Sequence, residues 1–132
     1  QTRHAAAAKV EEVLRFVGLE NLADKHVGDI PLVYQKRLEV ARALATQPRL
    51  LLLDEMMAGL NPREVQEAMD LVRRIRDGGV TVVMIEHVMH AIMNICDRIV
   101  VLHHGAKIAE GPPQEVSTSK TVIEVYLGEM AQ

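Results

Sequence analysis

Two short, almost wholly apolar runs with a helical stretch between them constrain the fold of this chain more than any other feature. Residues 50–53 are four consecutive leucines closed by Asp54 and Glu55, and residues 80–85 form the second run. Asn61 followed by proline opens the helical pattern between them, and Gly78 ends it. Apolar runs of this length are typical of strands buried on both faces, as in a parallel sheet. The sequence therefore predicts two parallel strands joined by a right-handed helical crossover.

Helical and strand patterns alternate through the rest of the chain. Residues 5–17 and 34–46 repeat apolar positions at helical spacing, with Gly18 as a C-cap and Pro31 before the second helix. After the second apolar run we expect a helix to about Cys96, strands at 98–103 and 107–110 around a turn at His104-Gly105, and one or two short helices to about residue 127. The predicted fold is α/β, a mostly parallel sheet flanked by helices with a terminal β-hairpin.

Polar residues stand at the ends of both apolar runs. Asp54-Glu55 closes the first run and Glu86-His87 closes the second. In open α/β sheets, ligands bind at the carboxyl ends of the strands. Two acids at such an end suit phosphoryl transfer, with one carboxylate acting on Mg²⁺ and the other orienting the attacking water. Without further context, two solvated acids at a strand end would be the favoured interpretation.

Longer motifs supply that context. Residues 49–62, RLLLLDEMMAGLNP, resemble the Walker B strand and D-loop of ABC ATPases, and AGLNP is the D-loop variant common in the branched-chain amino acid importer group. Residues 82–87 resemble the switch strand with its histidine, residues 97–102 the strand after it, residues 104–112 the closing hairpin, and residues 122–129, VIEVYLGE, the tail of the same group. The chain is identified as similar to the C-terminal half of an ABC transporter ATP-binding subunit, with the fold of the second part of a P-loop NTPase.

The resemblance implies a set of site residues. Glu55, as general base or water orienter, and His87, on the γ-phosphate, are the catalytic candidates. Asp54 would act on Mg²⁺, indirectly through water, and Asn61 would lie at the interface between two ATPase subunits; these two are the cofactor-binding candidates. The complete family protein uses ATP and Mg²⁺, and its partners are transmembrane permease subunits and a second ATPase subunit. It is cytoplasmic and peripheral at the inner face of the membrane.

Two features depart from the family pattern. Residues 31–34, Pro-Leu-Val-Tyr, stand where the family signature presents small residues and glycines to the partner's γ-phosphate. No G-x-x-x-x-G-K-[ST] loop occurs in the 132 residues, so the phosphate cradle of Walker A is missing. We expect residues 1–48 to be a remnant of the helical and signature region and residues 49–132 to be the second half of the ATPase core. The alternative function is a catalytically silent, truncated fragment that self-associates without binding ATP.

Charge, aromatic content and cysteine count argue against several other kinds of function. A net charge of −3 and an aromatic content of 2% argue against nucleic acid as a partner. Cys96 is the only cysteine, so an internal disulfide is excluded. His87 and His90 have helical spacing, but no third metal ligand is near them in sequence.

The apolar runs also predict self-association. In the complete family fold, the strands at residues 50–53 and 80–85 are flanked by strands of the N-terminal portion. An uncovered apolar strand is a template for another chain. We therefore expect a homo-oligomer, joined through sheet edges or by exchange of elements, with the helix at residues 5–17 as the exchanged piece.

Overall fold

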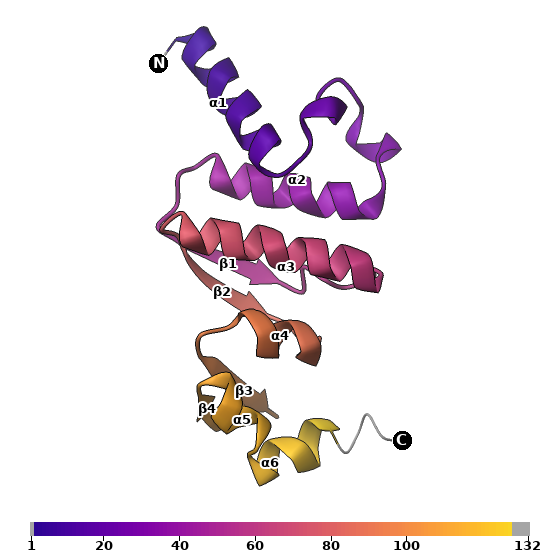
Figure 1. Cartoon of the computed structure of the whole chain (residues 1–132). Coiled ribbons are helices and arrows are strands. Elements are labelled where there is room, and N and C mark those ends of the chain that lie inside the picture. Colours follow the sequence, from indigo (N-terminus) through magenta and orange to yellow (C-terminus); the bar gives the residue numbers. More distant parts are fainter. Residues whose placement is uncertain (1, 128–132) are drawn as a thin grey trace. The chain divides into compact units, whose positions relative to one another are not determined.

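The structure, a computed structural model, describes residues 2–127 and divides into two compact units, Gln1–Ile85 and Glu86–Gln132. Each unit has its own helices and its own pair of strands (Figure 1). The predicted division after residue 48 follows the parts of the family protein and stays a prediction.

The first helix, α1 (Arg3–Phe16), has well-defined ends. The Thr2 side chain accepts a hydrogen bond from a first-turn N–H at 3.2 Å and caps the N-terminus. At the other end Gly18 has φ +78°, and the Leu19 N–H donates to the Leu14 carbonyl at 2.7 Å. This is the Schellman pattern, in which a glycine takes the left-handed conformation just past the helix. The predicted helix and its glycine C-cap are confirmed.

Two short 3₁₀ turns, η1 (Glu20–Leu22) and η2 (Val27–Asp29), lead to helix α2 (Leu32–Leu44). The helix begins two residues before the predicted start at residue 34, with Pro31 at its N-cap position. Proline lacks an N–H and its φ of −58° suits a helix entrance, so it does not delay the first turn.

The centre of the first unit is the β1–α3–β2 unit that the apolar runs predicted. Strand β1 (Leu50–Asp54) pairs in parallel with β2 (Thr81–Ile85), in a register that runs from Leu50 opposite Thr81 to Asp54 opposite Ile85. Helix α3 (Pro62–Asp77) connects them and lies over one face of the pair (Figure 1). Its apolar stripe is buried as predicted, at Val65, Ala68, Met69, Leu71, Val72 and Ile75.

Burial of the two strands on both faces was predicted, and this is wrong. Burial alternates along β1, where Leu51 and Leu53 are covered while Leu50 and Leu52 are 54% and 69% exposed. The same face of β2 carries Val83 and Ile85, which are 47% and 62% exposed. The physical reason is that, within the described residues, α3 covers only one side of this pair. We call the four exposed side chains Leu50, Leu52, Val83 and Ile85 the open sheet face.

The second unit contains the predicted hairpin. Strands β3 (Ile99–His103) and β4 (Ala106–Gly111) are antiparallel, and His104 and Gly105 between them have φ of +49° and +78°. Two central residues with positive φ characterise the type I′ turn, whose twist matches that of the flanking strands. The predicted turn position is confirmed.

Short helices complete the second unit around a small core. Ile99, Val116 and Val122 are buried together, with Ile92 and Cys96 among the partly buried residues packed on them. The helical segments are α4 (Met89–Ile95), α5 (Pro113–Ser117), α6 (Lys120–Val122) and a π-helical turn, η3 (Ile123–Leu127). The last two residues of the family-like tail, 128–129, lie outside the described residues. Within residues 2–127, the structure contains no helix that combines the length and apolarity needed to cross a membrane.

Candidate functional site

The predicted acids lie at the carboxyl end of the parallel strand pair. Asp54 is the last residue of β1, and the N–H of Glu55 donates to the carbonyl of Ile85 at 2.8 Å. This bond continues the sheet ladder by one residue and fixes the start of the following turn to the end of β2. Both acidic residues are exposed. The predicted position of the acid pair at the carboxyl end of the strand is confirmed.

The segment after the acids is anchored by two methionines. Met56 and Met57 are 7% and 2% exposed, so they point into the core while the acids before them face outward. The Ala58 N–H donates to the Glu55 carbonyl at 3.3 Å, and the Leu60 N–H donates to the Met57 carbonyl at 3.2 Å. Unbranched methionine side chains fill irregular core space well. This packing holds the turn that leads from the acid pair to α3.

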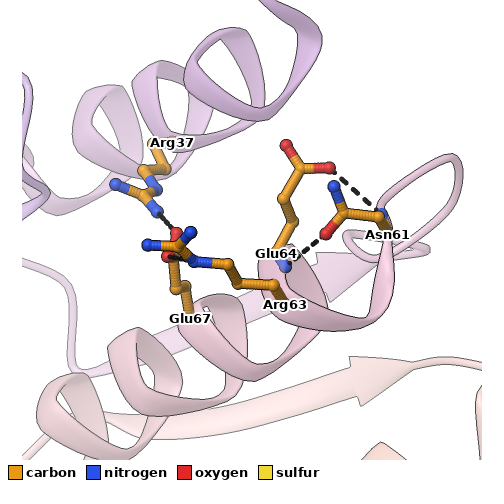
Figure 2. A network of polar contacts seen from close by, with 5 residues as sticks. All are labelled: Arg37, Asn61, Arg63, Glu64 and Glu67. Carbon is orange, nitrogen blue, oxygen red and sulfur yellow. Dashed lines mark hydrogen bonds and ion pairs between the residues drawn. The ribbon is translucent and has the colours of Figure 1, made fainter.

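Asn61 has a structural task in addition to the one predicted for it. Its side-chain oxygen accepts from the Glu64 N–H at 2.8 Å, and the Glu64 carboxylate accepts from the Asn61 N–H at 3.1 Å (Figure 2). These reciprocal bonds form a capping box, which satisfies N–H groups at the start of α3. Asn61 is thus held at the end of the turn that follows the acid pair. A contact to a second subunit stays a prediction; the cap uses the side-chain oxygen and does not involve the amide NH₂ group.

An ion-pair network joins α2 to α3 next to this turn. The Arg37 guanidinium donates to the Glu67 carboxylate at 2.7 Å, and Arg63 approaches the other carboxylate oxygen at 3.4 Å (Figure 2). The Arg37 side chain is 17% exposed, whereas that of Arg63 is 89% exposed. The Arg37 guanidinium is therefore largely covered, although the Glu67 side chain is 43% exposed. The contact connects α2, which begins in the signature-like segment (residues 31–34), to the helix after the acid pair.

The signature-like segment contacts the turn directly, which the sequence did not indicate. Gly59 has φ +78°, and a Cβ added there would lie 3.2 Å from the Cδ2 atom of Leu32. Gln35 ties the same helix end to the preceding loop by donating to the carbonyls of Ile30 and Val27 at 2.9 and 3.2 Å. The two segments are distant in the chain, and no local pattern reports such a contact. The predicted weakening of a contact between subunits by residues 31–34 stays a prediction.

His87 belongs to the second unit and is exposed. It follows β2 by two residues, as the sequence indicated. Its predicted role at a γ-phosphate stays a prediction.

The residues at the strand end suit a Mg²⁺ ion that is also bound by the phosphates of a nucleotide. Within residues 2–127, no group of three or more His, Cys, Asp or Glu side chains is arranged to hold a metal ion. Mg²⁺ at phosphoryl-transfer sites is bound by one or two carboxylates together with substrate phosphates and water. The exposed carboxylate of Asp54 can supply such a contact, directly or through water.

Comparisons with known proteins agree with these features. The profile of the ABC transporter family matches residues 2–58, and that of the branched-chain amino acid ATP-binding cassette transporter family matches residues 106–132. The high-affinity branched-chain amino acid transport ATP-binding protein BraF of Pseudomonas aeruginosa is 43% identical over 117 residues. The corresponding protein LivG of Escherichia coli is 40% identical over the same length. Each alignment covers 88% of this chain and 46% of the relative, so the chain spans about half the length of these proteins.

Solved structures lead to the same family. The ADP conformation of MJ1267, an ATP-binding cassette of an ABC transporter, superposes with a TM-score of 0.88 at 29% identity, over 97% of this chain and 52% of that one. The ABC transporter component CbiO1 of Clostridium perfringens superposes with a TM-score of 0.84 at 29% identity, over 98% and 53%. The predicted α/β fold of the P-loop NTPase type is confirmed. With the Walker B-like strand end, the capped helix after it and these matches together, the chain belongs to the ATP-binding proteins of ABC transporters, in the branched-chain amino acid group.

Proposed function

We propose that the protein acts as the ATP-binding subunit of an ABC importer, coupling ATP hydrolysis to uptake of branched-chain amino acids. The observation that carries the proposal is the acid pair at the carboxyl end of β1, fixed to β2 through the Glu55 N–H, in a chain 43% identical to a branched-chain amino acid transport protein. An exposed carboxylate at that edge is accessible to a nucleotide and to the water that attacks it.

The roles follow from the chemistry of each group. Glu55 orients or deprotonates the attacking water, and Asp54 acts on the Mg²⁺ that accompanies ATP. His87 contacts the γ-phosphate, and Asn61 lies at the interface with a second ATPase subunit. Permease subunits are the further partners, so the protein is peripheral at the cytoplasmic side of the membrane.

These 132 residues on their own are proposed to bind Mg-ATP weakly or not at all. Asp54, Glu55 and His87 act on a nucleotide whose phosphates are held by a glycine-rich loop in this family, and the sequence contains no such motif. Titration calorimetry of the 132-residue polypeptide measures this directly. Micromolar affinity for Mg-ATP would show that phosphate binding is supplied by other residues.

The catalytic role of Glu55 is tested in a protein that carries this sequence together with a phosphate-binding loop. Glu55→Gln keeps the size of the side chain and removes the carboxylate. We expect kcat to fall by about a hundredfold or more with nucleotide affinity retained. Glu11→Gln, an exposed change on α1, is the control for loss of a negative charge and should leave kcat unchanged. Steady-state hydrolysis by Glu55→Gln at the native rate would rule out the assignment.

A second candidate function is favoured by the open sheet face. Four large aliphatic side chains are exposed together on one side of a parallel strand pair, an arrangement that soluble proteins normally cover. We propose that the 132-residue polypeptide associates with a second copy through this face. Exchange of α1 between copies, the alternative route, stays a prediction.

A further inference from the structure

Glu55 has a backbone conformation that needs support. Its φ of +51° lies in the left-handed region, although it is not a glycine. For a residue with a Cβ this conformation is unfavourable, and it persists where surrounding contacts fix it. The direction in which the Glu55 carboxylate points depends on this conformation. Groups that fix the backbone of Glu55 therefore also position its carboxylate.

Hydrogen bonds from β2, from the following turn and from α2 reach the backbone of Glu55. Its N–H donates to Ile85 at 2.8 Å, and its carbonyl accepts from the Ala58 N–H at 3.3 Å. The third donor is the ammonium of Lys36, whose Nζ lies 3.4 Å from the same carbonyl oxygen. The first two bonds belong to the strand pair and to the turn itself. The third comes from α2, 19 residues earlier in the chain.

The position of Lys36 on α2 is itself fixed by its neighbours. Gln35 donates to the carbonyl of Ile30 at 2.9 Å, and Arg37 pairs with Glu67 on α3 at 2.7 Å. These contacts hold the first turns of α2 against the loop before it and against α3. Lys36 lies between Gln35 and Arg37 in the sequence and is half-buried. The contacts of these two neighbours therefore define the backbone position from which its side chain extends. At a given geometry, a charged donor makes a stronger hydrogen bond than a neutral one.

We propose that Lys36 is a positioning residue for Glu55: its ammonium holds the Glu55 carbonyl and so maintains the left-handed turn that aims the carboxylate at the strand end. The contact also links the helix after the signature-like segment to the acid pair. Its consequence for turnover rests on the proposed role of Glu55, whereas the contact itself does not.

The contact is tested in the 132-residue polypeptide by nuclear magnetic resonance. Lys36→Met keeps most of the aliphatic stem and removes the charge, Lys36→Arg keeps a donor, and Arg42→Met removes an exposed charge from the same helix as the matched control. We expect Lys36→Met to shift the carbonyl ¹³C resonance of Glu55 and to speed amide exchange at Ala58 several-fold, with an unchanged urea midpoint. Lys36→Arg should restore both signals, and Arg42→Met should leave them as they are. Unchanged Glu55 and Ala58 signals in Lys36→Met would overturn the proposal.

The consequence for catalysis is tested in a protein that also carries the phosphate-binding loop. Misplacing a reacting group costs rate and leaves ground-state binding intact, so Lys36→Met should lower kcat about tenfold with KM unchanged. A structural role alone would not separate kcat from KM in this way, and Lys36→Arg should recover the rate. If Glu55→Gln abolishes turnover while Lys36→Met retains the native kcat, positioning by Lys36 is wrong and the role of Glu55 stands. If Glu55→Gln retains turnover while Lys36→Met shifts the Glu55 resonance, the proposed function is wrong and the contact stands.

Discussion

The carboxylate of Glu110 on β4 pairs with two basic side chains close to it in the second unit. Its carboxylate lies 3.2 Å from the Arg98 guanidinium and 3.3 Å from the Lys107 ammonium. The hydrogen bond from Arg98, followed by that from Lys107, lowers the pKa of Glu110 below its ordinary value of 4.5. Because the pair is exposed to water, the stabilisation is small and sensitive to salt.

The pH dependence of this stabilisation has a definite sign. A carboxylate whose pKa is lowered by folding stabilises the native state fully above its unfolded pKa, and the contribution is lost as pH falls through the lowered value. We therefore expect Glu110→Gln to reduce the urea midpoint slightly at pH 6, with the difference shrinking as pH falls below 4.5 towards the lowered pKa. Urea titrations between pH 3 and 6 measure this. A difference that grows on acidification would contradict the assigned ion pairs.

At the scale of elements, α2 and α3 are joined by the ion pair of Arg37, whose side chain is largely buried, with Glu67. Removing the guanidinium in Arg37→Met leaves the Glu67 carboxylate without its shorter partner. A hydrogen bond to a charged, partly buried group contributes about 1–2 kcal/mol, so we expect the free energy of unfolding to fall by that amount. Arg63→Met removes the exposed partner of the same carboxylate and should change stability by less than about 0.5 kcal/mol. Equal losses in the two variants, measured by urea denaturation, would show that burial of Arg37 does not matter.

The hairpin turn in the second unit gives a test of backbone conformation alone. Gly105 has φ +78°, and a Cβ there would contact nothing within 4 Å. Gly105→Ala should therefore destabilise the chain by about 1–2 kcal/mol, purely through the left-handed conformation. Gly28 is equally uncrowded but has no positive φ, so Gly28→Ala is the matched control. A stabilising effect of Gly105→Ala in thermal or urea unfolding would mean that the type I′ turn is not formed.

At the scale of the whole molecule, the open sheet face predicts self-association. Full burial of a large aliphatic side chain contributes about 1.5–3 kcal/mol, so covering these half-exposed residues gives about 10 kcal/mol for two chains. This is comparable with the cost of association, about 4–15 kcal/mol. We expect a dimer in sedimentation equilibrium at micromolar concentration. A single species of 14.7 kDa would exclude it.

Variants locate the surface that associates. Leu52→Thr combined with Ile85→Thr makes the open sheet face more polar while keeping β-forming residues, and should shift the equilibrium towards monomer. Val100→Thr changes a 51% exposed residue of β3 in the second unit and serves as the control. Dissociation by Val100→Thr and not by the double variant would place the interface on β3.

The sequence by itself determined the order and type of the elements and the location of the acid pair. Asn61-Pro62 and Gly78 delimit α3, and His104-Gly105 sets the hairpin turn, because caps and turns depend on the backbone preferences of the residues that form them. The acids were placed at the strand end because they directly follow the four leucines that mark the strand. Helix starts differed by two residues at α1 and α2, where several residues could begin the first turn.

Only the tertiary structure decided how the elements support the acid pair and which surfaces stay uncovered. The contacts from Lys36 to Glu55, from Leu32 to Gly59 and from Arg37 to Glu67 join segments that no periodicity connects. The open sheet face contradicted the prediction of full burial, since an apolar run reports the preference of its side chains and not whether a partner covers them. Local patterns arise from each residue and its near neighbours, whereas these contacts depend on how the chain returns to itself in three dimensions.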